Sequence, residues 1–551
     1  MTSRVKSYKV VVGRVGEIPP VCTFVYQDQV RQQSFVTTVS TFSCFTAKAK
    51  KTMASWTTWL MTVLVGLATL VLVSWVLDII KRRRMPPGPF FWPIIGNIFM
   101  FGGQFYLTFV ELGKKYGDVF SLKLGMRDVV VLNSLDVIRE ALVKKGADFA
   151  GRTQTATGDL ISEGGKDIVM GDFNPTWKLQ RKLFHGAVRA YATGRTLEDK
   201  VQGALNDVID EFSSLEGKAV DVEAHVFKLV LNVVCSATFG HRYKMEDEDF
   251  QFLMRMSQKF FELGAQGMLA DIYPSLAFLP TPTKTTFTKM SNEFFKYFKR
   301  ELDQHIQTFD PDNLRDITDH FIKLQKEAEE EGDADINSLT DTHIRQTIVD
   351  IFGAALDTTV QSMRWSIVLL AAHPEVQEKL AAELDSVVER NRQPSLADRS
   401  ALPYMDSTIN EVLRFGIVVP LSVPHATTVD TTLMGYEIPK GTWIMPNLWN
   451  AVRDPEIWGD PNVFRPERFL DDDGKVLPKP SALMPFSAGR RACPGEPMAR
   501  ADIFLLLAGL VQKFKFSLPE GEGPPDLAPD PKGAGLFCIA CPYKVVMTHR
   551  K

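Results

Sequence analysis

The chain contains 551 residues, of which 45% are hydrophobic and 23% are charged, and this balance is typical of a globular protein with a large core. A formal net charge of -3 at pH 7 argues against a general nucleic-acid binder. The six cysteines are too few and too irregularly spaced for a disulfide framework. Two of them, Cys538 and Cys541, lie in the apolar run 535–546, which we interpret as a strand rather than as a zinc site.

Residues 1–52 are rich in Ser, Thr, Val and Gln and show no hydrophobic periodicity. Met53-Ala54-Ser55, directly before an apolar run, looks like a natural start of translation. We therefore expect residues 1–52 to be either a disordered segment or a translated upstream extension that the native protein lacks. Mass spectrometry of the native N-terminus distinguishes the two, because peptides from residues 10–45 exist only if the extension is real.

The run Trp56–Ile80 is apolar apart from Thr, Ser and Asp78, and its 25 residues suffice to cross a bilayer core of about 30 Å. The basic cluster 81–84 follows at once and favours a cytoplasmic location for the domain behind it. A buried core helix fits poorly, because the run lacks a polar face. A cleaved signal peptide is a further alternative, although no small-residue cleavage site precedes the cluster. The sequence predicts a retained transmembrane anchor over residues 53–84.

Residues 85–97 combine four prolines with two glycines. Proline fixes its own backbone and restricts that of its predecessor, so this segment is expected to be a stiff hinge. Residues 98–551 are expected to form one domain. It begins with a hairpin over residues 116–131, and the patterns that follow are mostly helical.

Two residue pairs share a face of a predicted helix. Trp177 and Arg181 lie one turn apart, and Glu411 and Arg414 lie at positions i and i+3. Arg468 follows the second pair in the segment 464–469. Such pairs are common on protein surfaces, where they contribute little to stability. Alone, they identify no chemistry.

The longest periodic segment, Thr340–Ala372, would span about 50 Å as a helix with a rise of 1.5 Å per residue. Its middle contains Gly353 and Ala354, followed by Asp357 and Thr358. One interpretation is a close helix crossing at the small residues. The other is functional: small side chains leave room for a bound group, while a carboxylate and a hydroxyl carry protons.

The segment 486–495 places Cys493 between Gly489 and Gly495 and at the start of an apolar helix predicted over residues 498–507. A lone cysteine is most often a small buried hydrophobe. Here, however, the helix N-terminus and the neighbouring arginines are expected to favour the thiolate. A thiolate is a good ligand for iron.

Five positions of this segment match the pattern Phe-x-x-Gly-x-Arg-x-Cys-x-Gly without a mismatch: Phe486, Gly489, Arg491, Cys493 and Gly495. The segment resembles the haem-ligand loop of the cytochrome P-450 family. The resemblance covers residues 85–551 and implies a mainly α fold with small β-sheets behind the N-terminal transmembrane helix. It also implies haem b (iron protoporphyrin IX) as cofactor, with Cys493 as the axial ligand of the iron and the motif residues around the cofactor.

The resemblance assigns further roles. It implies that the haem propionates are held by Trp177, Arg181, His425 and Arg491. It implies that Asp357 and Thr358 deliver protons, next to Ala355 where the family most often has glycine. It implies that Glu411, Arg414 and Arg468 form a structural lock behind the haem. It suggests substrate contacts at Ile161, Ile168, Ala354, Val418, Val419, Leu536 and Phe537.

Shorter segments, 149–157, 350–354 and 424–425, resemble animal microsomal members near steroid 17α-hydroxylase/17,20-lyase and the aryl-hydrocarbon-oxidising members. Ser257 stands where the steroid enzyme has an asparagine that meets the A-ring oxygen. The resemblance therefore implies a monooxygenase that inserts one atom of O2 into a lipophilic substrate, with a steroid as the first candidate. Aryl-hydrocarbon, other xenobiotic and fatty-acid hydroxylation are alternatives within the family.

The implied electron source is NADPH through the membrane-bound NADPH-cytochrome P-450 reductase, with cytochrome b5 as a further partner. The reductase is expected to meet a basic face formed by Lys178, Lys182 and Arg490. The implied location is the endoplasmic reticulum membrane, with the catalytic domain facing the cytoplasm. Two other classes stay open: a haem-thiolate isomerase that needs no reductase, which NADPH-dependent turnover would exclude, and a non-enzymatic haem sensor without a substrate-induced spin shift.

Overall fold

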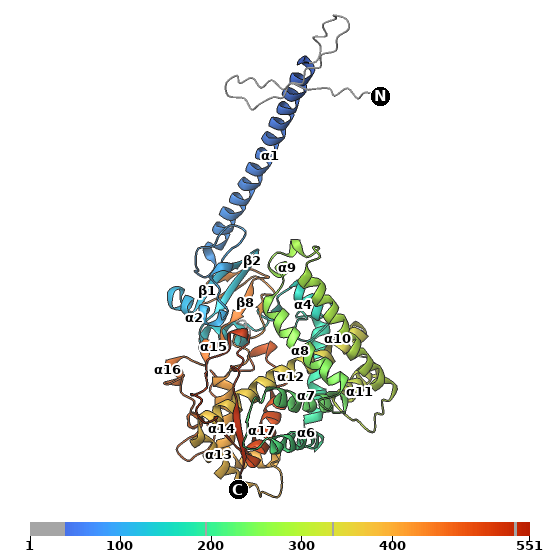
Figure 1. Ribbon diagram of the computed structural model, residues 1–551, viewed down its shortest axis with the longest axis vertical. Coiled ribbons are helices and arrows are strands. Elements are labelled where there is room, and N and C mark those ends of the chain that lie inside the picture. Colours follow the sequence, from blue (N-terminus) through green and yellow to red (C-terminus); the bar gives the residue numbers. More distant parts are fainter. Residues whose placement is uncertain (1–38, 193–194, 333–335, 534–536, 551) are drawn as a thin grey trace, which may run out of the picture. The chain divides into compact units, whose positions relative to one another are not determined.

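The computed structural model describes residues 39–192, 195–332, 336–533 and 537–550 (Figure 1). The chain divides into two compact units, residues 1–74 and residues 75–551. The larger unit is mainly helical, which confirms the fold class expected from the sequence.

Helix α1 extends over Val39–Lys81, and the 30-residue segment Ser55–Arg84 is long and apolar enough to cross a membrane. This agrees with the predicted anchor. The helix begins inside the segment 1–52, so residues 39–52 are helical. The expectations for residues 1–38 lie outside the described residues.

The largest sheet has five strands in the order β1-β2-β8-β5-β3. Its strands are Val119–Leu124 (β1), Arg127–Leu132 (β2), Gly151–Arg152 (β3), His425–Ala426 (β5) and Trp443–Pro446 (β8). Strands β1 and β2 form the predicted hairpin, with Gly125 at a φ of +56° in the turn. At the other edge, antiparallel pairing of β3 with β5 sets Arg152 opposite His425.

Two smaller sheets share no strand with this five-stranded sheet. A three-stranded sheet has the order β4-β10-β9, from Ala219–Val220 (β4), Phe514–Ser517 (β9) and Val545–His549 (β10). A hairpin pairs Thr431–Leu433 (β6) with Tyr436–Ile438 (β7). The strand interpretation of Cys538 and Cys541 is wrong, because β10 begins at Val545 and both cysteines precede it in irregular backbone.

Helices make up most of the larger unit (Figure 1). The helices before α12 are Phe105–Tyr116 (α2), Leu135–Arg139 (α3), Ala156–Ile161 (α4), Pro175–Ala192 (α5), Arg195–Ser214 (α6), Glu223–Phe239 (α7), Glu248–Gln266 (α8), Leu269–Ile272 (α9), Pro282–Gln307 (α10) and Ile317–Glu330 (α11). Those from α12 onward are Asp341–Ala372 (α12), Pro374–Val387 (α13), Pro403–Phe415 (α14), Leu448–Ala451 (α15), Pro455–Trp458 (α16) and Glu496–Lys513 (α17). Short helical turns include Pro274–Leu276 (η4), Pro466–Phe469 (η7) and Gly489–Arg491 (η8).

Helix α12 is the central helix of the domain and matches the predicted segment 340–372 closely. It packs against α7, α10, α14 and α17 (Figure 1). Residues 359–371 are buried along every face, and Met363, Ile367 and Leu370 are completely inaccessible. In the middle of this buried helix, however, Gly353 and Ala354 are exposed. The helix therefore has exposed backbone and small side chains at Gly353 and Ala354, whereas residues 359–371 are packed on every side.

Candidate functional site

Cys493 lies in a tight loop between η8 and α17. Gly489 has a φ of +73°, and a Cβ at this position would lie 1.7 Å from the carbonyl oxygen of Leu142, so only glycine fits. The backbone N–H of Cys493 donates to the carbonyl of Phe486 over 2.8 Å. Cys493 itself is exposed, although Arg491 before it is buried. The loop therefore presents an accessible thiol.

The loop alone does not favour the thiolate, contrary to the sequence expectation. Although Cys493 as a residue keeps exposed surface, the atoms packed around its sulfur shield the thiol from water and thereby raise its pKa. The backbone N–H of Gly495 and the charge of Arg181 lower this pKa, but they do not outweigh the loss of solvation. A coordinated metal ion deprotonates a thiol outright, so a bound metal would supply the missing stabilisation.

Four basic side chains gather beside this loop: Arg152 on β3, Arg181 on α5, His425 on β5 and Arg491 on η8. We call them the cationic cluster. Burial lowers the pKa of Arg491 to about 8 and that of Arg152 to about 9, and repulsion from the other arginines contributes to both shifts. Burial and the same arginines also hold the pKa of His425 well below its ordinary value. The charges of Asp167 and Asp172 oppose these shifts without cancelling them, and an anionic ligand would relieve the remaining repulsion.

Backbone carbonyls hold the cluster in place. Arg491 donates to the carbonyl oxygens of Gly171 (2.7 Å), Ala150 (2.8 Å) and Ile168 (3.3 Å). Its guanidinium lies 3.8 Å from the centre of the Trp177 ring. The indole N–H of Trp177 donates to the same Ile168 carbonyl over 2.9 Å.

Arg181 and His425 complete the arrangement. Arg181 donates to the carbonyl of Ala492, the residue before Cys493. His425 Nδ1 lies 2.8 Å from the carbonyl oxygen of Phe149, whereas its Nε2 is buried and has no hydrogen-bond partner among the described residues. A buried nitrogen without a partner, beside Arg152 and Arg491, indicates a site for a group that the protein alone does not provide.

Asp357 and Thr358 have separate partners. Thr358 Oγ1 donates to the carbonyl of Ala354 over 2.6 Å, as hydroxyls in helices commonly do. Asp357 Oδ1 accepts a hydrogen bond of 2.6 Å from Ser257 on α8. Burial raises the pKa of Asp357 to about 7, against the lowering effect of Ser257. Asp357 can therefore gain or lose a proton near neutral pH.

Small residues leave space beside this pair. A Cβ built on Gly353 would meet no atom within 4 Å. Ala354 is exposed and Ala355 is half-buried, although the helix is packed on both sides of them. The close helix crossing considered from the sequence is therefore wrong at Gly353, because no helix among the described residues approaches it closely enough to contact a methyl group.

Glu411 contacts both Arg414 and Arg468 directly. Glu411 and Arg414 on α14 are completely buried and form a two-pronged ion pair with N–O distances of 2.7 and 2.8 Å. Arg468 on η7 donates to the same carboxylate over 3.0 Å. Arg414 also donates to the carbonyls of Val452 and Pro461, so the network ties α14 to the segment 452–468. None of these contacts involves the cationic cluster.

The suggested substrate contacts fall into different environments. Ala354 is exposed, and Ile161 is half-buried against Met256, Phe287 and Met290 of α8 and α10. Val419 and Phe537 are half-buried as well. Ile168 and Val418 are only 4% and 9% exposed, which leaves them little surface for a ligand because they pack in the core. Leu536 lies outside the described residues.

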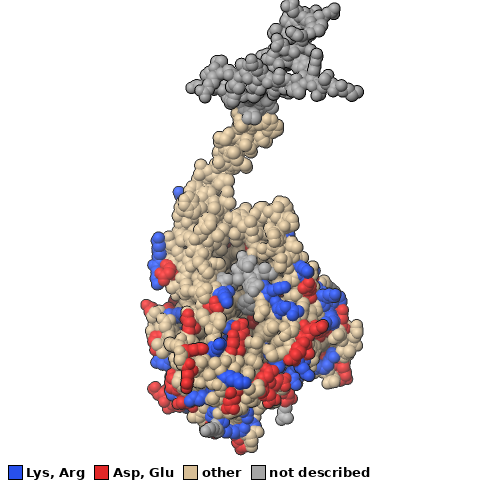
Figure 2. Space-filling model, viewed as in Figure 1, with Lys and Arg blue, Asp and Glu red and all other residues tan. Residues whose placement is uncertain are grey.

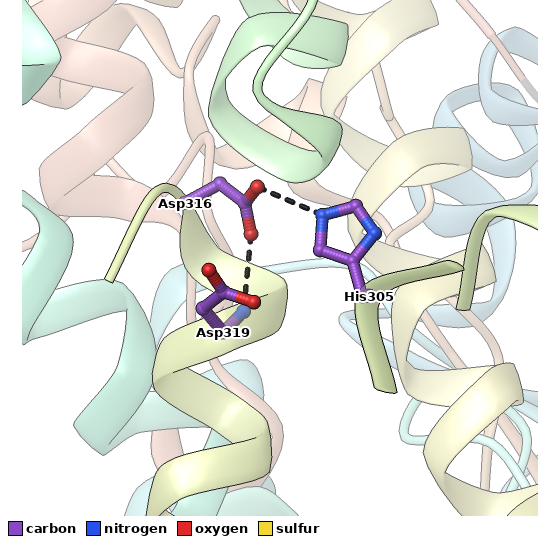
Figure 3. Close-up of side chains that lie close together, drawn as sticks. All are labelled: His305, Asp316 and Asp319. Atoms are coloured by element: carbon purple, nitrogen blue, oxygen red, sulfur yellow. Dashed lines mark hydrogen bonds and ion pairs between the residues drawn. The ribbon is translucent and has the colours of Figure 1, made fainter. Parts of the chain in front are cut away.

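His305, Asp316 and Asp319 form a further cluster with metal-ligating side chains (Figure 3). Each is already engaged by protein. His305 Nε2 lies 2.9 Å from Asp316, whose other oxygen accepts the backbone N–H of Asp319 at the start of α11. The carboxylate of Asp319 accepts two hydrogen bonds from the guanidinium of Arg315 and one from its backbone N–H. These contacts account for the cluster as an ion pair and helix cap that joins α10 to α11.

The comparison with family models decides the classification: the cytochrome P-450 model matches residues 86–547. The chain belongs to the cytochrome P-450 family. Its members are haem-thiolate monooxygenases. The mainly helical fold of this chain agrees with the family, and its N-terminal apolar helix fits a membrane anchor.

Individual relatives support the assignment to this family. Cytochrome P-450 1A1 of Felis catus is 36% identical over 462 residues, which cover 82% of this chain and 89% of the relative. Steroid 17-alpha-hydroxylase/17,20 lyase of Ictalurus punctatus is 35% identical over 449 residues, covering 81% and 87%. A solved structure of a zebra fish cytochrome P-450 with progesterone matches with a TM-score of 0.73 at 32% identity, covering 81% of this chain and 99% of that one.

The residues fit the family's cofactor. Haem is a flat group with an iron at its centre and two carboxylates at its edge. The accessible thiol of Cys493 suits the iron, and the cationic cluster with its orphaned His425 nitrogen suits the carboxylates. Arg152 is the member of this cluster that sequence reasoning missed. It belongs to the segment 149–157 quoted above, but its position opposite His425 depends on strand pairing across 273 residues of chain.

Proposed function

We propose that this cytochrome P-450 holds haem b between the Cys493 loop and α12 and oxidises a lipophilic substrate, with a steroid as the first candidate. The observation that carries this proposal is the cationic cluster beside an accessible Cys493 thiol. Cys493 would bind the iron through its sulfur. Arg152, Arg181, His425 and Arg491 hold the propionates, and the ring of Trp177 supports Arg491.

When bound, the haem would supply the activation of dioxygen, which the Cys493 thiolate would promote. The residues of α12 supply space and protons. Gly353 and Ala354 leave the cofactor side of the helix bare. Asp357 holds a proton at its carboxyl group near neutral pH, and the Thr358 hydroxyl, one residue further, can donate and accept hydrogen bonds.

Electrons reach this site from NADPH through NADPH-cytochrome P-450 reductase, which we propose docks on Lys178, Lys182 and Arg490. All three side chains are exposed. Lys178 and Arg490 lie over the same ring, that of Phe173, at 4.8 and 5.8 Å from its centre. Lys182 is one turn from Lys178 on α5, so the three positive charges form one surface that complements an acidic partner. Cytochrome b5 is a second candidate for this surface.

Charge reversal tests the docking surface. We expect Lys178→Glu with Lys182→Glu to raise the KM for reductase at least tenfold at low salt, and to leave the substrate-induced spin shift unchanged. Lys515→Glu, an exposed lysine on β9, is the matched control. An unchanged reductase KM in the double variant would contradict the surface.

The membrane location is proposed from two features. The basic cluster 81–84 follows the apolar helix, which favours a cytoplasmic catalytic domain at the endoplasmic reticulum. Within the larger unit, Phe278 beside α9 is 77% exposed and Ile94 of the hinge is 61% exposed. Tyr273 donates to the Ile94 carbonyl over 3.1 Å, so these two apolar segments lie side by side. The surface over α9 carries few charged side chains (Figure 2), as a surface that meets lipid would.

A single screen tests the substrate proposal. The chain is co-expressed with the reductase, and progestogens, estrogens, fatty acids and polycyclic aromatics are assayed for NADPH-dependent hydroxylation. Oxidation of a progestogen would support the steroid proposal, which rests on the steroid-hydroxylase relative and the progesterone-bound neighbour. Oxidation of polycyclic aromatics alone would favour the aryl-hydrocarbon alternative. Turnover without NADPH would favour an isomerase.

A further inference from the structure

The carboxylate of the half-buried Asp350 joins the loop 162–174, which lies between α4 and α5, to the central helix. Asp350 of α12 accepts hydrogen bonds from the backbone N–H groups of Ile168 and Val169, with distances of 2.6 and 3.3 Å. The carbonyl of the same Ile168 accepts hydrogen bonds from Trp177 and Arg491. Asp350 is therefore connected through one residue of the loop to two side chains that face the proposed propionate site.

A second acid on the loop, Asp167, faces Asp350. Asp167 is only 3% exposed, and its Oδ1 accepts the backbone N–H of Met170 over 2.9 Å. Its carboxyl group is close enough to Asp350 for a hydrogen bond between them when one is protonated. Arg152, the cation that acts on Asp167, is itself occupied by the carbonyls of Val169, Val423 and Pro424.

Burial disfavours two negative charges at this position. Burial raises the pKa of Asp350 well above its ordinary value, and the charge of Asp167 raises it further, against the two backbone N–H bonds. Burial also raises the pKa of Asp167, against its backbone hydrogen bonds and Arg152. The other charged groups that act on this acid or on its arginine neighbours come from α5, β5, η8 and the loop: Arg181, His425, Arg491 and Asp172. Two adjacent buried carboxyl groups avoid double ionisation by retaining a proton.

We propose that Asp167 and Asp350 share one proton, which fastens the loop 162–174 to α12 and thereby steadies the haem-propionate contacts. The two acids are positioning residues, because they act through Ile168 and do not reach the cofactor. This inference rests on the proposed haem site. It adds to that site a pH-dependent contact between the loop 162–174 and α12, which forms when the pair holds its proton and weakens when the pair loses it.

The direction of the pH effect follows from the raised pKa values. Folded acids with raised pKa values bind protons that the unfolded chain has already released, so their contribution to stability falls as pH rises from the ordinary aspartate range to the raised pKa. Once both carboxylates are charged, they repel each other across the joint between loop and helix. Haem should therefore be held more tightly on the acid side of this transition than on the alkaline side.

Haem transfer from the full-length holoprotein to excess apomyoglobin tests the inference. We expect the wild-type rate to rise on the order of tenfold as pH rises through the raised pKa of the pair, because one unit of coupled pKa change corresponds to tenfold. Asp350→Asn keeps a carbonyl acceptor for Ile168 and offers an amide donor to Asp167. It should lose haem slowly at every pH. Asp350→Ala should lose haem fast at every pH.

The matched control is Asp172→Asn, an exposed acid of the same loop, which should keep the wild-type pH profile. Amide hydrogen exchange over residues 165–171 gives a second readout, and the alkaline increase seen in wild type should be absent in Asp350→Asn. A pH profile of Asp350→Asn equal to that of wild type would overturn the inference, even if Asp350→Ala fails to fold. A protein that binds no haem at all would instead contradict the proposed cofactor site, so the two failures are distinguishable.

Discussion

Arg152 is the residue whose role depends most on the fold. Its short strand pairs with the strand of His425, and this pairing brings a buried guanidinium into the cluster beside Cys493. The cluster has three arginines and no anion of equal charge, so its members repel one another. Such an arrangement is costly for the protein alone and favourable once a dianionic group binds.

Replacement of this arginine tests the role directly. We expect Arg152→Gln to weaken haem binding roughly 10- to 100-fold, because a hydrogen bond to a charged group contributes about 1.5–3 kcal/mol. The measurement is the haem dissociation rate of the purified protein. Lys182→Gln, which removes an exposed positive charge on α5, is the control and should leave this rate unchanged. Equal rates for Arg152→Gln and wild type would contradict the assignment.

Asp357 provides a second prediction at the scale of single residues. Its pKa of about 7 lies above the unfolded value, so the cost of burying its charge grows as pH rises toward 7 and is constant beyond. Asp357→Asn removes that cost while keeping an acceptor for Ser257. We expect the variant's gain in Tm to be small near about pH 5 and larger near about pH 8. A gain of the same size at both pH values would show that Asp357 does not titrate in this range.

At the scale of elements, α12 was predictable because its hydrophobic period continues over its whole length and a proline ends it. The exposed surface at Gly353 follows from the same sequence, since glycine and alanine cannot fill the space beside them. The partners of this helix were not predictable. Ser257 and Asp167 reach it from segments that lie 100 and 183 residues away in the chain, and no local pattern encodes such contacts.

The contact between His305 of α10 and Asp316, which joins α10 to α11, gives a prediction at the scale of elements. Burial lowers the pKa of His305, but the hydrogen bond and charge of Asp316 outweigh burial and raise it overall. The protonated pair therefore stabilises the fold below the ordinary histidine pKa of about 6.5, and this contribution is lost as pH rises through the raised value.

We expect His305→Gln to lower the free energy of unfolding by about 3 kcal/mol near about pH 6, since it breaks a buried pair. The difference from wild type should shrink above the raised pKa. Denaturant unfolding of the holoprotein at several pH values measures it. His320→Gln, a half-buried histidine on α11, is the control. A difference that does not change with pH would indicate a loss of packing rather than of a charged pair.

At the scale of the whole molecule, the sequence was sufficient for the fold class and the family, because the residues around Cys493 are contiguous and the anchor is a single apolar run. It was insufficient for the geometry between distant segments. The pairing of Arg152 with His425 and the link from Asp350 to Ile168 arise only when strands and loops meet in space. Sequence reasoning also misjudged the thiol, because the desolvation of its sulfur becomes known only from the packing around the loop.

The central claim is that Cys493 binds iron through sulfur in a haem site of the cytochrome P-450 family. Iron-edge X-ray absorption of the purified full-length protein tests it most directly, because sulfur scatters differently from oxygen and nitrogen. We expect one sulfur neighbour in the wild-type protein and none in Cys493→Ser, while Cys541→Ser should keep it. A sulfur neighbour that persists in Cys493→Ser, or iron without sulfur in the wild-type protein, would contradict the account.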